Sequence, residues 1–553
     1  VTFFHERRCV CRVCGGSEYM KEKIRIESPE GYLTRAAGFF RKDGSFRLAL
    51  VSLLTVLVTA FMSYTLLIVY GHGNPDAITE GMSAYTAGDW ALACGRWATR
   101  YMNAAAGNVI MPPVWVTLYM LCVFVSVMLL VKLWKLRSAL AVCLISVLMA
   151  VNPTVIEQSL LQYMFMAWGI SNLLGTTFVY LCCAPGGRPW VRITAAALCT
   201  AVAFGLYQAV IGYICMCFCL TLILSLSRGT DMRGALRLVL RVLIAGVCGA
   251  LLYFIILRVE FARYGVEQSS RVEDFSLAAI FSSLSYSVPD AYVTFFEYFG
   301  ESVLRRGTCY ILLAALFAVF LALSLITLFR RRQYANIACL LVLIALVPAF
   351  ANISKIVFPY NTTVTIMEYQ NMLVVPFLFA FAEGCELKLS ALYNPARICT
   401  CLLCAALGWG YIVSANATYK CYELSYRHIG YEVSAILDDV YDMPGYTRGE
   451  TVAFAGFPDD SYLRENVGIY KYAYGQYDNP VFWDGMMGLQ VCRRNYLTEY
   501  FGIDGGYIYG GQYNDAVHSA EFAAMPVWPA DGSVQRINGM IVVKLFDDPP
   551  IFD

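Results

Sequence analysis

A polar stretch between the first two apolar segments carries most of the side chains whose types suit chemistry. Asp76 and Glu80 are four residues apart, so one face of a helix would present both carboxylates. Asp89 follows, and after it two guanidinium groups, Arg96 and Arg100. Carboxylates transfer protons as general acids or bases, and arginine binds anions through paired hydrogen bonds. Two interpretations remain open: such chemistry, or helix-capping acids and arginines that reach to lipid headgroups.

The same stretch contains the signals that begin helices. Asn74 suits the N-cap position and Pro75 the first helical position, so a helix is predicted to start at Pro75. After Gly88, Asp89 signals a second start. An apolar side along the membrane surface would consist of Ile78, Met82 and Tyr85.

The composition is that of a membrane protein. Of the 553 residues, 59% are hydrophobic and 15% are charged, and the mean hydropathy is +0.57. This balance excludes a soluble cytosolic enzyme. Forty-one Lys and Arg against forty Asp and Glu leave a formal net charge of +1, which gives no general attraction for nucleic acid.

Apolar runs predict about eleven transmembrane helices. They are residues 48–70, 113–131, 138–156, 158–182, 193–206, 208–226, 236–257, 308–329, 335–351, 366–384 and 398–416. Basic residues before the first run and in alternate connections predict a cytoplasmic N-terminus, and an odd number of crossings then places the C-terminus outside. The expected fold is an α-helical polytopic membrane protein.

The chain is expected to have three parts. They are a basic cytoplasmic arm, 1–47; a transmembrane domain, 48–416, with external connections at 71–112 and 258–306; and an external C-terminal domain, 417–553. In the third part Tyr, Asp, Gly and Asn replace Leu and Ala. Strands are predicted at Thr451–Phe454 and Met540–Leu545 and a helix over 419–441, so this small domain should be α+β. Cys421 and Cys492 are placed where oxidising conditions would let them pair.

Short motifs in the first external connection carry a family resemblance. Asn74-Pro75-Asp76, Gly81, Gly88-Asp89-Trp90 and Gly95-Arg96-Trp97 lie after the first span and before a second span that begins with proline. This arrangement resembles the GtrII-type glucosyltransferase family, and Leu206-Tyr207-Gln208-Ala209 is similar to that family's Tyr-Gln element. The family pattern often has two adjacent acids, whereas Pro75 precedes a single Asp76, which makes Glu80 or Asp89 the candidate second acid.

The resemblance implies a GT-C fold in the cell membrane and the transfer of glucose, or a related hexose. The donor would be a polyprenyl-phosphate-sugar and the acceptor a cell-surface polysaccharide or other glycan, as in O-antigen modification. A flippase and a carrier-loading glucosyltransferase are then expected partners. No cofactor is identified, a divalent metal requirement stays open, and the N-terminal Cys9, Cys11 and Cys14 lack the second pair that a zinc site needs.

The resemblance implies a general base and phosphate ligands among these residues. Asp76 would be the base that accepts the acceptor's proton, with Glu80 or Asp89 as alternatives. The donor phosphate would be held by cationic groups. The candidates are Arg96, Arg100, Arg305 and Lys355.

Some candidates have structural alternatives. Tyr207 and Gln208 would bind a sugar, or would instead satisfy backbone groups freed at a turn. Lys355 and Glu368 would hold the donor phosphate and the acceptor, or would instead pair with each other.

Two other classes of function compete with the enzyme. A transporter or flippase of lipid-linked sugar predicts ionisable residues at mid-membrane, whereas the span interiors here are almost free of charge. A membrane-anchored glycan-binding protein would tolerate loss of Asp76 and Arg96.

Overall fold

The computed structural model describes residues 45–269, 277–300, 307–358, 365–387, 391–458, 460–473, 486–503 and 511–549. The chain divides into two compact units, 1–49 and 50–553, and of the first unit only the opening turn of helix α2 is described. Most of the basic arm, including its cysteines, lies outside the described residues.

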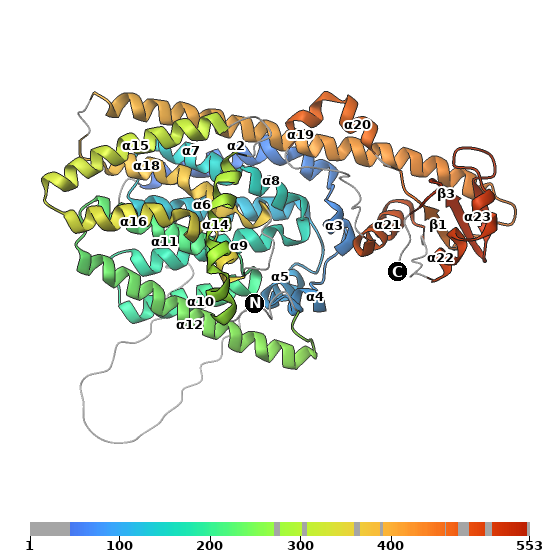
Figure 1. Cartoon of the computed structure of the whole chain (residues 1–553), viewed down its shortest axis with the longest axis horizontal. Coiled ribbons are helices and arrows are strands. Elements are labelled where there is room, and N and C mark those ends of the chain that lie inside the picture. Colours follow the sequence, from blue (N-terminus) through green and yellow to red (C-terminus); the bar gives the residue numbers. More distant parts are fainter. Residues whose placement is uncertain are drawn as a thin grey trace, which may run out of the picture. The chain divides into compact units, whose positions relative to one another are not determined.

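Ten helices in the described residues are long and apolar enough to cross a membrane. They are α2 (Ser45–Tyr70), α6 (Pro112–Trp134), α7 with α8 (Ala139–Ala150 and Pro153–Leu160), α9 (Gln162–Cys183), α10 (Pro189–Leu206), α11 (Val210–Ser227), α12 (Met232–Tyr264), α15 (Gly307–Arg330), α16 (Tyr334–Ala351) and α19 (Tyr393–Tyr441). Helices of the second unit run side by side as a bundle (Figure 1). The predicted polytopic helical fold is confirmed, including the sharp turn between α10 and α11.

About eleven membrane helices were predicted and ten are found in the described residues; the predicted span 366–384 accounts for the difference. It consists of two 3₁₀ turns, η1 (Thr365–Met367) and η2 (Tyr369–Leu373), followed by an eleven-residue helix, α18 (Val374–Gly384). Gln370 and Asn371 interrupt the apolar run, and the Gln370 amide donates to the Ala351 carbonyl at the end of α16 (2.9 Å). Because such turns leave backbone groups unpaired, they are tolerated where protein buries them.

This segment still returns the chain to the other end of the bundle. The Glu383 carboxylate near the end of α18 accepts hydrogen bonds from the backbone N–H groups of Arg137 and Ser138 (2.8 and 3.1 Å). The Arg228 guanidinium donates to the carbonyls of Trp134 and Ala380 (2.7 and 3.4 Å). We call this end, formed by residues 134–138, 228 and 383, the basic end.

The opposite end, which we call the loop end, is formed by residues 71–111 and the turn 207–209. The first connection folds into three short helices, α3 (Pro75–Glu80), α4 (Asp89–Ala93) and α5 (Trp97–Ala105), and not into one long surface helix. The Asn74 side chain accepts from the Ala77 N–H (3.1 Å), which confirms the predicted cap. Gly81, at φ +106°, ends α3 in a conformation that favours glycine.

The connection predicted at 258–306 is largely helical. Helix α12 continues to Tyr264, and α14 (Leu277–Gly300) runs across the direction of its neighbours (Figure 1). Helix α14 packs against α16 and the short helix α17 (Ile353–Val357). The Tyr292 hydroxyl donates to the Ala345 carbonyl (2.7 Å), which ties α14 to α16.

The C-terminal part is built on the end of α19. This single helix of 49 residues runs through the predicted boundary at 416 and 417. It is followed by β1 (Val452–Ala455), α20 (Ser461–Asn466), η3 (Gly468–Tyr472), α21 (Met486–Phe501), α22 (Gly511–Val517), α23 (Ala520–Ala524), β2 (Val534–Ile537) and β3 (Met540–Lys544). The sheet order is β1-β3-β2, with β1 parallel and β2 antiparallel to β3, so both predicted strands are present. Cys421 and Cys492 are both buried, and they do not form the disulfide that the sequence allowed.

Close packing of α10 against α12 depends on a glycine. A Cβ atom on Gly249 would lie 2.6 Å from the Thr200 Cβ and 2.8 Å from the Ala197 carbonyl oxygen. Three residues earlier on the same helix, a Cβ on Gly246 would meet only the Phe178 ring, at 4.0 Å. The two glycines therefore form a matched pair for testing this helix contact.

We expect Gly249→Ala to destabilise the protein by about 1–3 kcal/mol, because the added methyl group separates two packed helices. Gly246→Ala should be neutral or slightly stabilising, because alanine favours a helix. Thermal unfolding in detergent checks both variants. Equal melting temperatures for the two would contradict the packing described here.

Candidate functional site

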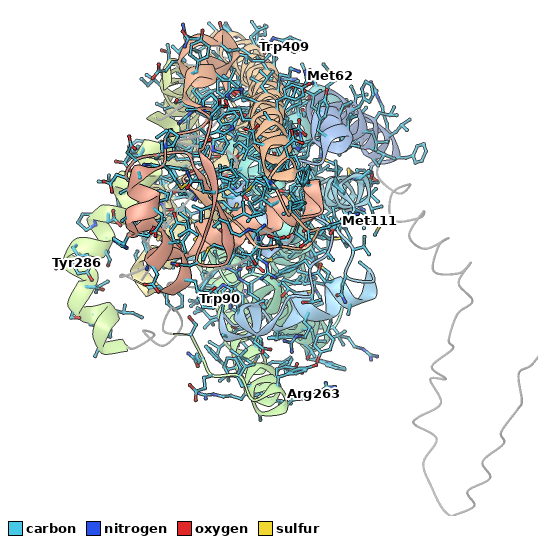
Figure 2. The ribbon with its side chains drawn as sticks, turned by 90° about the vertical axis from the view of Figure 1, so that its right-hand side faces the viewer. Met62, Trp90, Met111, Arg263, Tyr286 and Trp409 are labelled. Atoms are coloured by element: carbon cyan, nitrogen blue, oxygen red, sulfur yellow. The ribbon has the colours of Figure 1, made fainter. Side chains whose placement is uncertain are left out.

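The site lies at the loop end, where α3 is held by its neighbours. The Asn74 N–H donates to the Leu160 carbonyl at the end of α8 (3.1 Å). The Gln162 side chain donates to the Gly71 and His72 carbonyls (3.0 and 3.1 Å). These bonds fix the chain just before Asp76, which lies in the first turn of α3. Figure 2 looks onto this end, with Trp90 of α4 at its surface.

Arg96 is the cation whose charge acts on Glu80, one of the predicted acids. Its positive charge acts on Glu80 and on the hydroxyl groups of Tyr85 and Tyr207. The guanidinium carbon lies 5.4 Å from the centre of the Tyr207 ring, within the range of a cation–π contact. Its Nε–H is buried without an acceptor among the described residues. A buried guanidinium N–H without an acceptor is suited to binding an anion.

Glu80 faces this cation from α3. Burial raises the pKa of the Glu80 carboxyl, and the opposing charge of Arg96 limits the rise. Tyr163, at the start of α9, lies within electrostatic range of Asp76, Glu80 and Arg96. Its ring packs against that of Tyr85, with centroids 4.6 Å apart. Two acids, one cation and two tyrosines are thus brought together from three segments of the chain.

Tyr207 and Gln208 support the turn that precedes Arg96. The Gln208 amide donates to the Cys94 carbonyl (2.6 Å) and to the Tyr253 hydroxyl (3.0 Å). That hydroxyl donates in turn to the Gly95 carbonyl (3.1 Å). Gly95 has φ +79°, and a Cβ there would come within 2.5 Å of both side chains. Gln208 therefore satisfies backbone groups of the first connection, while Tyr207 lies beneath the guanidinium group.

Asp89 and Arg100 form a separate pair. Their atoms Oδ1 and Nη2 are 3.0 Å apart, and the Asp89 side chain is 77% exposed. Arg100 also donates to the Ala87 carbonyl (3.3 Å) and lies over the Tyr264 ring, 4.1 Å from its centre. These contacts connect the first connection to the end of α12.

Lys355 pairs with Asp290 of α14 (2.7 Å), and not with Glu368 as one interpretation of the sequence suggested. Glu368 is buried at the start of η2 and lies near Glu157 of α8, so that their charges interact. The Gln158 side chain donates to the Ile366 carbonyl (2.7 Å). Arg305 lies outside the described residues.

Several residues of this end were not singled out from the sequence. Glu157 lies between two predicted membrane spans and Tyr163 within the second of them, and Asn495 and Glu499 lie about 400 positions from α3. The one available signal was the cluster of polar side chains over 157–163 within apolar surroundings. Among the described residues, no group of three or more His, Cys, Asp or Glu side chains could hold a metal ion.

His72 is buried beside α3 and stacks on Tyr426 of α19, with ring centres 4.0 Å apart. Burial lowers the pKa of His72 from its ordinary value of 6.5 to about 4. The imidazole is therefore neutral in the folded protein near neutral pH, while the unfolded chain takes up a proton below about pH 6.5.

The fold and the site define a multi-pass membrane protein whose charged and aromatic groups gather at one end of a helical bundle. The family model described as glucosyl transferase GtrII matches residues 74–381, more than half of the chain, so the chain belongs to this family. It is accordingly a membrane glucosyltransferase. The matched region begins at the Asn74 cap of α3 and ends within α18. No curated protein and no solved structure gives a significant match.

The shifted pKa of His72 predicts an acid-sensitive fold. Since the folded pKa lies below the unfolded one, this histidine favours folding fully above about pH 6.5 and loses that contribution as the pH falls towards 4. By pH 5.5 the loss is about 1 kcal/mol. His72→Phe keeps the stacking and should flatten the fall in melting temperature between pH 7.5 and 5.5. His518→Gln, at an exposed histidine, is the control and should change nothing. A slope in His72→Phe equal to that of the wild type would contradict this assignment.

Proposed function

We propose that this glucosyltransferase takes glucose from a polyprenyl-phosphate carrier and transfers it to a cell-surface glycan on the outer side of the membrane. The buried Nε–H of Arg96, which has no acceptor among the described residues, and the action of its charge on Glu80 of α3 are the observations that carry the proposal. It supplies a phosphate site next to a proton acceptor, which are the two groups that such a transfer needs. The polytopic helical body also fits a GT-C type of enzyme.

The reaction is a displacement at the anomeric carbon of glucose. The acceptor hydroxyl oxygen forms a bond to this carbon while its proton passes to the Asp76 carboxylate. The bond from the anomeric carbon to the carrier's phosphate oxygen breaks, and its electron pair stays on the phosphate. Arg96 stabilises the negative charge that develops there. Glu80 faces the same cation and is the alternative base.

Asp89 and Arg100 are given a supporting role in this proposal. Their exposed ion pair and the contact of Arg100 with Tyr264 hold the first connection against α12. Lys355 is the alternative phosphate ligand. It would serve only after exchanging its Asp290 partner for the phosphate.

A cavity of about 520 Å³ supports a lipid-linked donor. Its lining comes from α11, α14, α15, α16 and α18 and is almost wholly apolar, with Phe295, Phe299, Phe317 and Phe377 among the contributors. An isoprenoid chain would bury its methyl groups there. Helix α14 connects the cavity to Lys355 through Asp290.

The orientation in this proposal follows from charge. Basic residues of the connections gather at the basic end, which by the positive-inside rule supports an orientation with the loop end and the C-terminal domain outside. Glucose would then have to be loaded onto the carrier in the cytoplasm and turned across the membrane. A carrier-loading glucosyltransferase and a flippase are the partners that these steps require.

Substitution in the site tests the enzyme directly. We expect Asp76→Asn to lower kcat by about 10²–10⁴-fold, because a missing general base costs that much. Arg96→Ala should abolish transfer and Arg96→Lys should retain part of it, because lysine keeps the charge but not the paired hydrogen bonds. The measurement is transfer of radiolabelled glucose by purified protein in detergent.

Asp89→Asn is the matched control, since it removes an exposed carboxylate from the same connection. It should change kcat by less than about threefold, as expected for an exposed ion pair. Full activity of Asp76→Asn would move the base to Glu80 or Asp89. Absence of transfer by the wild type with a validated donor and acceptor would overturn the enzyme proposal in favour of transport or glycan binding.

Filling the cavity tests the lipid part of the proposal. Ala314→Trp places an indole in the cavity and should raise KM for the long-chain donor about tenfold, because the chain loses its apolar contacts. A donor with a short, soluble chain should react as with the wild type. Ala315→Trp, on the same helix and exposed outside the cavity lining, is the control. Equal KM values for Ala314→Trp and Ala315→Trp with the long-chain donor would place the isoprenoid elsewhere.

A further inference from the structure

Helix α21 of the C-terminal part is bonded directly to the helix that carries the acids. The Asn495 side-chain amide donates to two carbonyl groups of α3, those of Ile78 and Thr79, at 2.9 Å each. The last carbonyls of a helix lack their usual partners within it. That of Ile78 accepts a long bond from the Gly81 N–H (3.3 Å), and Asn495 supplies a further donor to it and to the Thr79 carbonyl. Asn495 therefore caps the C-terminal end of α3 from a distant part of the chain.

A second bond follows where α3 ends. The Glu499 carboxylate, one helical turn beyond Asn495, accepts from the Met82 N–H (3.1 Å). Between the two bonded sites lies Gly81 at φ +106°, where the chain turns away from the helix. The two side chains of α21 thus hold the chain on both sides of this turn.

Helix α3 needs such support because it has six residues. A helix of this length does not persist in water by itself, so its position is set by the groups that bond to it. Its N-terminal end is held by the Leu160 carbonyl, which accepts from Asn74, and by the Tyr426 hydroxyl of α19, which donates to the Gly73 carbonyl (2.7 Å). Asp76 and Glu80 lie between the two supports.

We infer that Asn495 and Glu499 are positioning residues for the transfer reaction: α21 holds α3 so that Asp76 and Glu80 stay aligned with Arg96. This inference rests on the proposed function of those acids. Helix α21 lies beyond residue 381, where the match to the family model ends. The C-terminal part therefore completes the site that the matched region contains.

The first experiment replaces Asn495. Asn495→Asp keeps the shape but turns an oxygen towards two carbonyls, so it should lower kcat more than Asn495→Ala does. We expect a fall of about 10–100-fold in kcat, with KM for the donor changed less than about threefold, because Arg96 is untouched. Asn466→Asp is the matched control: among the described residues its amide donates to the Tyr462 carbonyl of its own helix and to no other group, and the variant should behave as the wild type.

Glu499 gives a second pair of variants. Glu499→Gln keeps an oxygen that accepts the Met82 N–H and should restore most of the kcat that Glu499→Ala loses. If Glu499 acted through its negative charge, Glu499→Gln, which is neutral, would not restore kcat. Equal loss in both variants would overturn its assigned role.

Hydrogen exchange measured by mass spectrometry separates this inference from the proposed function. In Asn495→Asp, amides of residues 75–82 should exchange at least tenfold faster, while those of α9 and α19 keep the wild-type rate. Unchanged exchange in 75–82, or faster exchange with unchanged kcat, would overturn the positioning role. If instead Asp76→Asn is fully active while Asn495→Asp loosens α3 and lowers kcat, the assignment of Asp76 fails and the role of α21 stands.

Discussion

Helix α19 is the element on which the arrangement of this protein depends. Its 49 residues form one unbroken helix that begins among the membrane helices and ends in the C-terminal part, ahead of β1. A continuous helix transmits its direction along its length, whereas a flexible linker does not. Because α19 is continuous, α21 is held beside the first connection and bonds to α3.

Polar side chains near the site pair the backbone groups that helix ends leave free, as a hydrocarbon environment requires. An unpaired backbone group is costly in lipid, so glutamine and asparagine side chains appear where helices end or break. The Gln162 amide donates to a carbonyl just after α2, and the Gln208 amide donates to a carbonyl in the turn before Arg96. The Gln370 amide donates to the last carbonyl of α16. These side chains fix the loop end without placing a charge in the middle of a membrane span.

Arg96 is held in place by hydrogen bonds of this kind. The turn before it is held by the Gln208 amide and the Tyr253 hydroxyl, and Tyr207 lies beneath the guanidinium group. The Nε–H of Arg96 has no acceptor among the described residues and is available to an anion, while its charge also acts on the Glu80 carboxylate. Arg100, by contrast, forms an ion pair with Asp89.

The sequence by itself determined the membrane helices, the cap at Asn74, the starts of α3 and α4 and two of the strands, because each depends on neighbouring residues. It also indicated Asp76, Glu80 and Arg96 as a group, since they share one connection. Only the tertiary structure decided that 366–384 is a broken segment, that Lys355 pairs with Asp290, and that Asn495 and Glu499 bond to α3. These contacts join positions far apart in the chain, and residue spacing carries no information about which distant side chain will satisfy a given backbone group.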